Sequence, residues 1–411
     1  MSTVATPIDV EKIRSQFPVL HQHVHGKPLI YFDNAATNQK PKRVVDALIR
    51  YYEHDNANIH RGIHTLAERA TQAYESTRHA LQGFINARHT EEIIFTRGVT
   101  ESINLVASSY GRAILKAGDE VIISGLEHHS NIVPWQMICD ERKAVLKVIP
   151  VSETGELEMA AYRSLLSDKT RMVAVNHASN SLGTINPIKE IITLAHQYGA
   201  VVLIDGAQAA AHLTIDVQDL DCDFYCISSH KMFGPTGTGI LYGKQEILEK
   251  MPPYMGGGEM IKEVTFGKTT YNNLPYKFEA GTPNIADVIA WKEAIYFIQE
   301  LGKDAIAAYE NTLLRYATQK MSEIPAVRLI GTASEKVSVL SFVVTGIHHF
   351  DIGQMLDARG IAVRTGHHCT QPLMEQFGLE GTVRASFSVY NTKQEIDQLQ
   401  EGVERIVNFM K

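Results

Sequence analysis

Short apolar runs alternate with stretches of helical periodicity over most of the chain. The runs at 120–124, 171–176 and 201–205 place apolar residues at successive positions and lack the two-residue alternation of a half-exposed strand. Such strands, separated by helices, are typical of a mostly parallel sheet that is covered on both faces. We therefore predict an α/β fold. Further strands are expected at 29–32, 93–96, 146–151 and 224–227, and helices at 41–54, 64–86, from about 101, at 132–142 and at 188–198. Residues 9–25 are expected to form a helix followed by a turn.

The pattern changes in the second half of the chain. Residues 251–290 contain Pro252-Pro253 and three successive glycines, so we expect a long loop with little regular structure. A helical region at 285–323 leads to strands near 337–344, 361–364 and 383–389, and a capping-box pattern at 392–395 opens a last helix. We predict an N-terminal segment (1–25) that forms part of a small domain, a large domain (26–300) and a small C-terminal α+β domain (301–411).

Polar residues follow the predicted strands of the large domain at the point where each strand ends. Because parallel strands end at the same edge of a sheet, these side chains should lie close together. Free amide groups in the first turn of the helix near residue 101, with the hydroxyl of the residue before it, would suit a phosphate. The residues concerned are Thr100, His128, Asn180, Asp205 and Lys231.

Lys231 closes an apolar strand and precedes a glycine-rich loop. A single lysine in such a place is usually solvated, and Asp205 alone could be the cap of the turn that follows it. Together with Gln208, Ser228 and His230, however, these residues form a chemical set. Burial lowers the pKa of an amine and makes it a nucleophile toward carbonyl groups. An amine, a carboxylate for a ring nitrogen and donors for a phosphate would hold an aromatic cofactor that carries an aldehyde.

The composition excludes several classes of protein. The chain has 411 residues, 44% of them hydrophobic, and its net charge of −7 comes without a basic run. Nucleic-acid binding is therefore not expected. We find no secretory signal and no apolar run of membrane-spanning length. Four cysteines in so long a chain fit a reducing compartment better than a disulfide framework, so we expect a cytoplasmic protein.

One pair of adjacent histidines could suggest a metal site. The adjacent His128 and His129 should project to different sides, and the ligand spacings of zinc motifs are absent. We predict no metal site. His128, at a strand end, is better placed to lie over an aromatic ring and to relay a proton.

The segment 364–369 (Arg-Thr-Gly-His-His-Cys) is a second candidate centre. Cys369 follows two imidazoles and lies near Arg364, and positive surroundings favour the reactive thiolate. The other three cysteines lie in apolar stretches and are expected in the core. A purely structural loop cysteine is the alternative interpretation of Cys369.

These motifs together resemble the cysteine desulfurases, fold-type I enzymes that depend on pyridoxal 5′-phosphate. Within that family the chain is most similar to group II, the SUF-type enzymes related to selenocysteine lyases, which are class V aminotransferase relatives. One departure is Thr370, where similar enzymes usually have alanine after the catalytic cysteine. The motifs that carry the resemblance occupy residues 33–37, 60–64, 97–101, 127–129, 205–208, 229–231, 278–283 and 364–369.

The resemblance implies a role for each candidate residue. Lys231 would bind the cofactor covalently, Asp205 would hold its ring nitrogen, Gln208 would meet the ring oxygen, and His128 would stack on the ring. Thr100, Ser228 and His230 would bind the phosphate, with Thr282 contributed by a second subunit. Asn180, Arg384 and Arg364 would hold the substrate carboxylate, a task that suits a guanidinium fork. Cys369 would accept sulfur.

The implied function is an L-cysteine desulfurase that yields L-alanine and a persulfide on Cys369, and so supplies sulfur for iron–sulfur cluster assembly. We expect a homodimer, a sulfur-acceptor protein of the SUF type, and a short loop that partly shelters Cys369. A selenocysteine lyase that acts on L-selenocysteine, or an aminotransferase of the same fold, is the nearest alternative. A non-catalytic assembly scaffold is a further one, although a scaffold would not require Lys231, Asp205 or Cys369.

Overall fold

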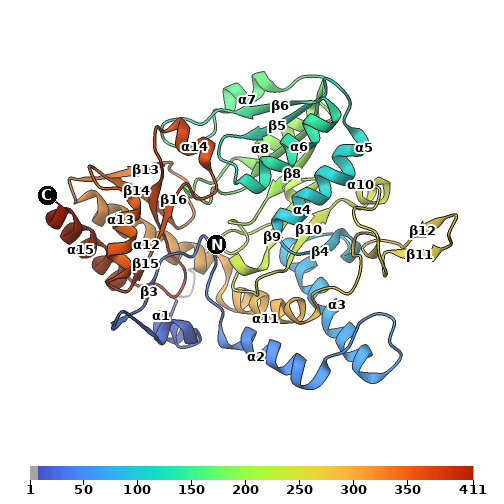
Figure 1. Ribbon diagram of the computed structural model, residues 1–411, viewed down its shortest axis with the longest axis horizontal. Helices are drawn as coiled ribbons and strands as arrows, with labels where there is room; N and C mark the ends of the chain where they lie inside the picture. Colours follow the sequence, from blue (N-terminus) through green and yellow to red (C-terminus); the bar gives the residue numbers. More distant parts are fainter. Residues whose placement is uncertain (1–7, 411) are drawn as a thin grey trace, which may run out of the picture.

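A seven-stranded sheet forms the centre of the protein (Figure 1). The computed structural model describes residues 8–410. The strand order is β4-β10-β9-β8-β7-β5-β6, and all neighbours are parallel except β10, which runs antiparallel to both β4 and β9. The predicted α/β fold with a mostly parallel sheet is therefore confirmed. The strands are β4 (Ile93–Thr96), β5 (Glu120–Ser124), β6 (Val145–Ile149), β7 (Thr170–Asn176), β8 (Val201–Asp205), β9 (Phe224–Ser228) and β10 (Gly239–Gly243).

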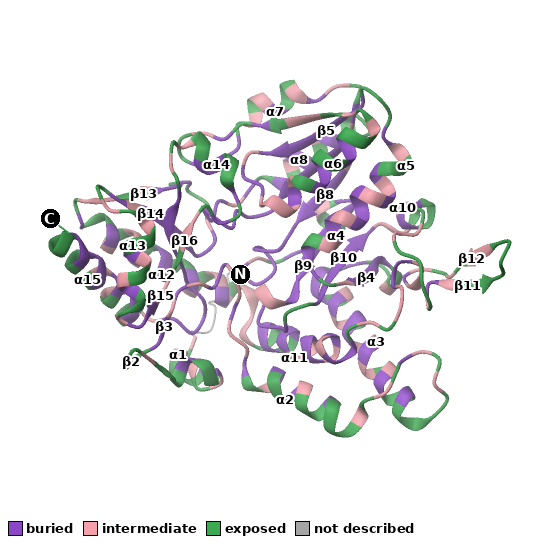
Figure 2. Ribbon diagram, viewed as in Figure 1, coloured by how far each residue is buried: buried purple, intermediate pink, exposed green. Residues whose placement is uncertain are grey.

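Helices cover both faces of this sheet, which explains why its strands are continuously apolar. In β8, Val202 and Ile204 pack into one core with helices α2, α3, α8 and α11, whereas Leu203 packs into a second core with α4 and α6. Figure 2 shows the strands buried at the centre of the molecule. The helices are α2 (Lys42–Arg50), α3 (Thr65–Ile85), α4 (Val99–Val106), α5 (Arg112–Ile114), α6 (Val133–Arg142), α7 (Met159–Leu165), α8 (Ile188–Gln197), α9 (Val217–Leu220), α10 (Gln245–Lys250) and α11 (Ile285–Leu301).

The C-terminal part is built on a smaller antiparallel sheet with the order β13-β14-β17-β16. A separate apolar core joins this sheet to helices α12, α13 and α15. A short parallel pair, β15 with β3 (Ile30–Tyr31), brings the segment after residue 31 against the C-terminal sheet. The elements are α12 (Lys303–Ser322), β13 (Val327–Ile330), β14 (Val339–Val344), α13 (His349–Asp357), β15 (Ile361–Ala362), β16 (Arg364–Gly366), α14 (Gln371–Gln376), β17 (Thr382–Ser386) and α15 (Lys393–Met410).

Two predicted regions differ from the structure. The helix and turn expected at 9–25 are present as α1 (Val10–Arg14) and a turn of 3-10 helix (Pro18–His21), but an unpredicted hairpin of β1 (His23–Val24) and β2 (Lys27–Pro28) follows them. Within 251–290, β11 (Ile261–Val264) and β12 (Thr269–Tyr271) form a hairpin where we expected little regular structure. This hairpin projects from the molecule (Figure 1).

The predicted domain limits remain a prediction, and the first seven residues of the N-terminal segment lie outside the described residues. Between residues 8 and 410, no helix combines the length and the apolar character needed to cross a membrane.

Candidate active site

A cavity of about 260 Å³ opens at the carboxyl ends of the parallel strands. It lies between the seven-stranded sheet and the C-terminal sheet, and both contribute to its wall. Every residue that the sequence predicted for the site lines it, except Thr282. Those residues are Thr100, His128, Asn180, Asp205, Gln208, Ser228, His230, Lys231, Arg364, Cys369 and Arg384.

Lys231 ends a turn of 3-10 helix (Ser229–Lys231) directly after β9. Protein atoms surround its amine, and this desolvation lowers the pKa of Lys231 to about 8, while Asp205 opposes the shift and Arg384 adds to it. Among residues 8–410 the amine makes no hydrogen bond or ion pair within the usual distances. Lys231 therefore presents an amine with an appreciable neutral fraction at neutral pH.

Asp205 is the last residue of β8 and is buried. Its Oδ1 accepts a hydrogen bond from the Ala207 N–H at 2.9 Å, and burial raises the pKa of its carboxyl group. The neighbouring Gln208 donates from Nε2 to the Ala35 carbonyl oxygen at 2.6 Å. The second oxygen of Asp205 remains available to a cationic partner within the cavity.

His128 follows β5 and faces the cavity, whereas His129 turns toward the segment that carries Cys369. The Nδ1 atom of His128 accepts the Ser130 N–H at 3.1 Å. Burial, with Lys231 close by, lowers the pKa of His128 to about 3, so its ring is neutral at neutral pH. The two histidines project to different sides as predicted. No cluster of metal-ligating side chains is present in the part of the chain that the structure describes.

The first turn of α4 forms the other end of the cavity. Gly98, which precedes the helix, has a φ of 144°, and a Cβ atom there would lie 3.3 Å from the Ser228 hydroxyl. That hydroxyl accepts the Val99 N–H at 2.9 Å. Thr100 is exposed, and burial lowers the pKa of His230 to about 4. Glycine thus brings free helix amides, two hydroxyl groups and an imidazole to one place, an arrangement that suits a phosphate.

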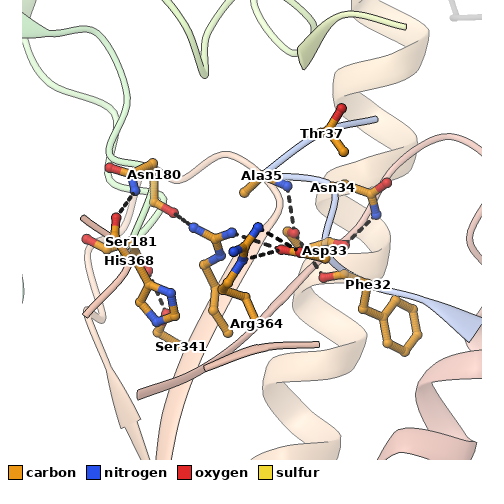
Figure 3. Close-up of polar contacts among 12 residues, drawn as sticks. Phe32, Asp33, Asn34, Ala35, Thr37, Asn180, Ser181, Ser341, Arg364 and His368 are labelled. Atoms are coloured by element: carbon orange, nitrogen blue, oxygen red, sulfur yellow. Dashed lines mark hydrogen bonds and ion pairs between the residues drawn. The ribbon is translucent and has the colours of Figure 1, made fainter. Parts of the chain in front are cut away.

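Asp33 is a site residue that the sequence did not single out. It forms ion pairs of 3.1 Å with both Arg364 and Arg384, which face each other on the paired strands β16 and β17 (Figure 3). Arg384 is buried and also donates from Nη1 to the Asn180 carbonyl oxygen at 2.8 Å, while its Nε has no hydrogen-bond partner. This unpartnered buried donor makes the cavity suitable for an anionic group.

Cys369 lies on the opposite side of the cavity from the sheet core, in the loop after β16. Its side chain is exposed, whereas Cys139, Cys222 and Cys226 are buried as predicted. The expected partial shelter of Cys369 is therefore wrong for the single chain. His368 and Cys369 have φ values of 52° and 57°, an uncommon conformation for non-glycine residues, and the Asn180 amide donates to the His368 carbonyl oxygen at 2.7 Å.

Thr282 is exposed and lines a separate cavity of about 400 Å³, together with Arg97 and Glu101. It is not among the residues that line the cavity with Lys231. Its assignment to the site of a second subunit remains a prediction.

The residues present fit pyridoxal phosphate. A phosphate would meet the amides of α4, a ring nitrogen would meet the free oxygen of Asp205, and an aldehyde would meet the unpaired amine of Lys231. The spacing follows from strand order, because β4, β8 and β9 end at the same edge of the sheet.

Comparison with known proteins agrees with this geometry. The model of the aminotransferase class-V family matches residues 30–399. The chain belongs to this family. A cysteine desulfurase of Synechococcus elongatus is 53% identical over 98% of the chain, and one of Dickeya dadantii is 50% identical over 97% of the chain and 96% of its own length. The chain spans less than two thirds of the first three curated relatives, at 65%, 58% and 65% of their lengths.

Solved structures of family members share the whole fold. The cysteine desulfurase CsdA of Escherichia coli superposes with a TM-score of 0.91 at 38% identity, covering 98% of this chain and all of that one. A cysteine desulfurase of Thermococcus onnurineus gives a TM-score of 0.93 at 36% identity over 99% of this chain and all of that one. The predicted fold-type I architecture is confirmed.

Proposed function

We propose that the protein is a cysteine desulfurase of group II, which depends on pyridoxal phosphate. The observation that carries the proposal is that an unpartnered, desolvated lysine and an exposed thiol border the same cavity. An aminotransferase needs the lysine alone, whereas transfer of sulfur to the protein needs both. The names of the relatives support this assignment.

The cofactor would be held by three groups of residues, one for its aldehyde, one for its ring and one for its phosphate. Lys231 would bind its aldehyde, Asp205 and Gln208 would face its ring, and His128, being neutral, could lie against the ring without adding a charge. Thr100, Ser228 and His230 would bind its phosphate, with Thr282 of a second copy of the chain. When bound, pyridoxal phosphate supplies a conjugated ring that withdraws electrons from the α-carbon of an amino acid.

The substrate would be oriented by its carboxylate. The free Nε of Arg384, the Asn180 amide and Arg364 would bind it, and these three residues line the same cavity as Cys369. Lys231 would carry the α-proton of the substrate, since an amine with a pKa near 8 can both accept and return a proton at neutral pH.

Sulfur transfer would then use the Cys369 thiolate. The thiolate attacks the sulfur of the substrate, the new S–S bond forms as the C–S bond breaks, and the electron pair of the C–S bond stays with carbon. Protonation gives alanine, and one sulfur atom remains on Cys369 as a persulfide. The reaction needs no external oxidant. A sulfur-acceptor protein of the SUF type would collect the sulfur for iron–sulfur cluster assembly in the cytoplasm, and exposure of Cys369 supports such a transfer.

Product analysis tests the proposal. Protein reconstituted with pyridoxal phosphate should show a visible absorbance band that Lys231→Ala removes or shifts, and it should convert L-cysteine to alanine and sulfide in the presence of dithiothreitol. L-Selenocysteine in a parallel reaction would decide between sulfur and selenium as the preferred atom. Release of a keto acid in place of alanine would indicate an aminotransferase, and the absence of any conversion would indicate a scaffold; either result would overturn the proposal.

Sedimentation tests the proposed homodimer, in which Thr282 would bind the phosphate held by the other chain. The active protein should sediment as a dimer, and Thr282→Ala should weaken retention of the cofactor. An active monomer at assay concentration would contradict this part of the proposal.

A further inference from the structure

We propose that His129 is a positioning residue that holds the Cys369 loop against the turn that carries His128. Its role in sulfur transfer rests on the proposed function, but its contacts do not. His129 is not one of the residues that line the cavity.

The side chain and the backbone of His129 contact opposite ends of one short segment. Its N–H donates to the Cys369 carbonyl oxygen at 2.8 Å, and its Nε2 accepts the N–H of Gln371 at 3.1 Å. The second bond joins the 3-10 turn after β5 (His129–Asn131) to the start of α14, more than 240 residues later in the chain. Both ends of the peptide segment 369–371 are therefore fixed to the same residue.

A second imidazole, that of His367, also contacts the loop. The Nδ1 atom of His367 accepts the N–H of Cys369 at 3.1 Å, and its ring lies 5.6 Å from that of His129 at an angle of 35°. Partial burial and the nearby His367 lower the pKa of His129, so its ring is neutral and can accept a hydrogen bond. The acceptor role requires that the proton of the neutral ring sits on Nδ1.

The loop needs such support because of its backbone conformation. His368 and Cys369 occupy the left-handed region in succession, which costs about 1 kcal/mol or more for each residue and persists only when surrounding contacts impose it. Cys369 itself is exposed, so its neighbours supply these contacts; the Nε2 atom of the buried His368, for example, lies 2.8 Å from the Thr382 hydroxyl oxygen. The Asn180 amide holds the His368 carbonyl, and His129 holds the two residues that flank Thr370.

The arrangement couples the two halves of the site. His128 faces the cavity, and the next residue contacts the loop of the thiol, so a single turn sets the separation between a bound cofactor and Cys369. Without the side-chain contact of His129, the loop should sample other conformations, and the thiol should meet the substrate sulfur less often.

A matched pair of substitutions tests this inference. His129→Gln keeps an acceptor oxygen at a reach similar to that of Nε2, whereas His129→Asn keeps the same amide on a side chain that is one methylene shorter. We expect amide hydrogen exchange of the peptide that contains residues 369–371 to be on the order of 10-fold faster in His129→Asn than in the wild type, and close to wild type in His129→Gln. Exchange of β5 serves as an internal control in both variants.

Kinetics separates positioning from a general effect on folding. His129→Asn should produce alanine about 10-fold more slowly, with an unchanged KM for cysteine and an unchanged absorbance of the bound cofactor, and His129→Gln should restore most of the rate. Unchanged exchange of residues 369–371 in His129→Asn would overturn the inference, and so would faster exchange with a wild-type rate of alanine formation. If the wild type forms no alanine from cysteine, the proposed function fails, while the exchange measurement still judges the contact.

Discussion

Substitution of Glu279 by glutamine tests a fully buried ion pair, in which Glu279 meets Arg78 of α3. Glu279 accepts two hydrogen bonds from Arg78 at 2.7 and 3.0 Å, and its Oε1 also accepts the Phe95 N–H at 2.7 Å. The two side chains are only 2% and 6% exposed. Through Glu279, the segment that carries Thr282 is bonded to Arg78 of α3 and to the Phe95 N–H of β4.

The expected loss of stability follows from the contacts that Glu279→Gln leaves in place. Glutamine keeps an oxygen for Phe95 but presents an amide donor to a guanidinium group. Loss of one partner from a buried pair costs about 3–5 kcal/mol, and Arg78 retains Glu75 at 2.8 Å, which favours the lower limit. With an entropy of unfolding of about 2 cal/mol/K per residue, a loss of 3 kcal/mol over 411 residues lowers Tm by about 3–4 °C.

Differential scanning calorimetry of the protein without cofactor measures this shift directly. The matched control is Asp219→Asn, which removes an ion pair with Lys189 whose side chains are 62% and 60% exposed. Screening by solvent makes such a pair nearly neutral, so the control should change Tm by less than about 1 °C. A Tm for Glu279→Gln within 1 °C of the wild type would refute the reasoning.

Three further predictions concern groups around the cavity. Thr370→Ala removes the hydroxyl that donates to the His367 carbonyl oxygen at 2.8 Å, so amide hydrogen exchange in 367–371 should be about 5-fold faster for a loss of about 1 kcal/mol. Equal exchange rates in the variant and the wild type would contradict this. Glu127→Gln should destabilise the fold by about 1–3 kcal/mol, because the new amide group must face a hydrogen-bond donor of either Asn176 or Asn131. Urea titration should show that adding Asn131→Asp recovers most of the lost stability, and a double variant less stable than Glu127→Gln would contradict this. The rate at which Lys231 captures pyridoxal phosphate should rise with pH through about 8, because the lowered pKa of Lys231 makes the neutral amine available above that value. Asp205→Asn should move the midpoint of this pH profile to lower pH, since the carboxylate raises the pKa of Lys231. Stopped-flow absorbance should detect the change, and an unchanged midpoint would contradict it.

Local patterns were sufficient to predict six of the seven strands of the central sheet and most of the cavity; β10 was missed, because it follows a glycine-rich stretch that we expected to be a loop. Asp205 and Lys231 could be placed together because each ends an apolar strand, and neighbouring parallel strands end at one edge. The same argument placed His128 and Asn180. It applies only where strands are buried on both faces, which makes their limits visible in the sequence.

Contacts between distant segments could not be predicted in this way. Asp33 meets Arg364 and Arg384 because β3 pairs with β15 and β16 pairs with β17, and no spacing in the sequence encodes those pairings. The role of His129 depends likewise on a loop more than 200 residues away. The hairpin of β11 and β12 is short and exposed, so it lacks the apolar pattern that reveals a strand.

The exposure of Cys369 also escaped prediction. The residues next to Cys369 in the sequence indicated a reactive thiol but not its solvent exposure. That exposure depends on how the loop after β16 lies over the cavity. Thr370 is buried beneath this loop, while the cysteine before it faces outward. The direction of each side chain follows from two successive left-handed residues, a conformation that sequence alone seldom indicates outside glycine and asparagine.

Mass spectrometry of the cysteine-containing peptides tests the central claim most directly. After an anaerobic reaction of the reconstituted protein with L-cysteine and no acceptor, the peptide that contains Cys369 should gain one sulfur atom, with one alanine formed per modified chain. The peptides of the buried Cys139, Cys222 and Cys226 should remain unmodified, and Cys369→Ser should form neither alanine nor a persulfide. Alanine formed at the wild-type rate by Cys369→Ser, or sulfur found only on another cysteine, would contradict the account.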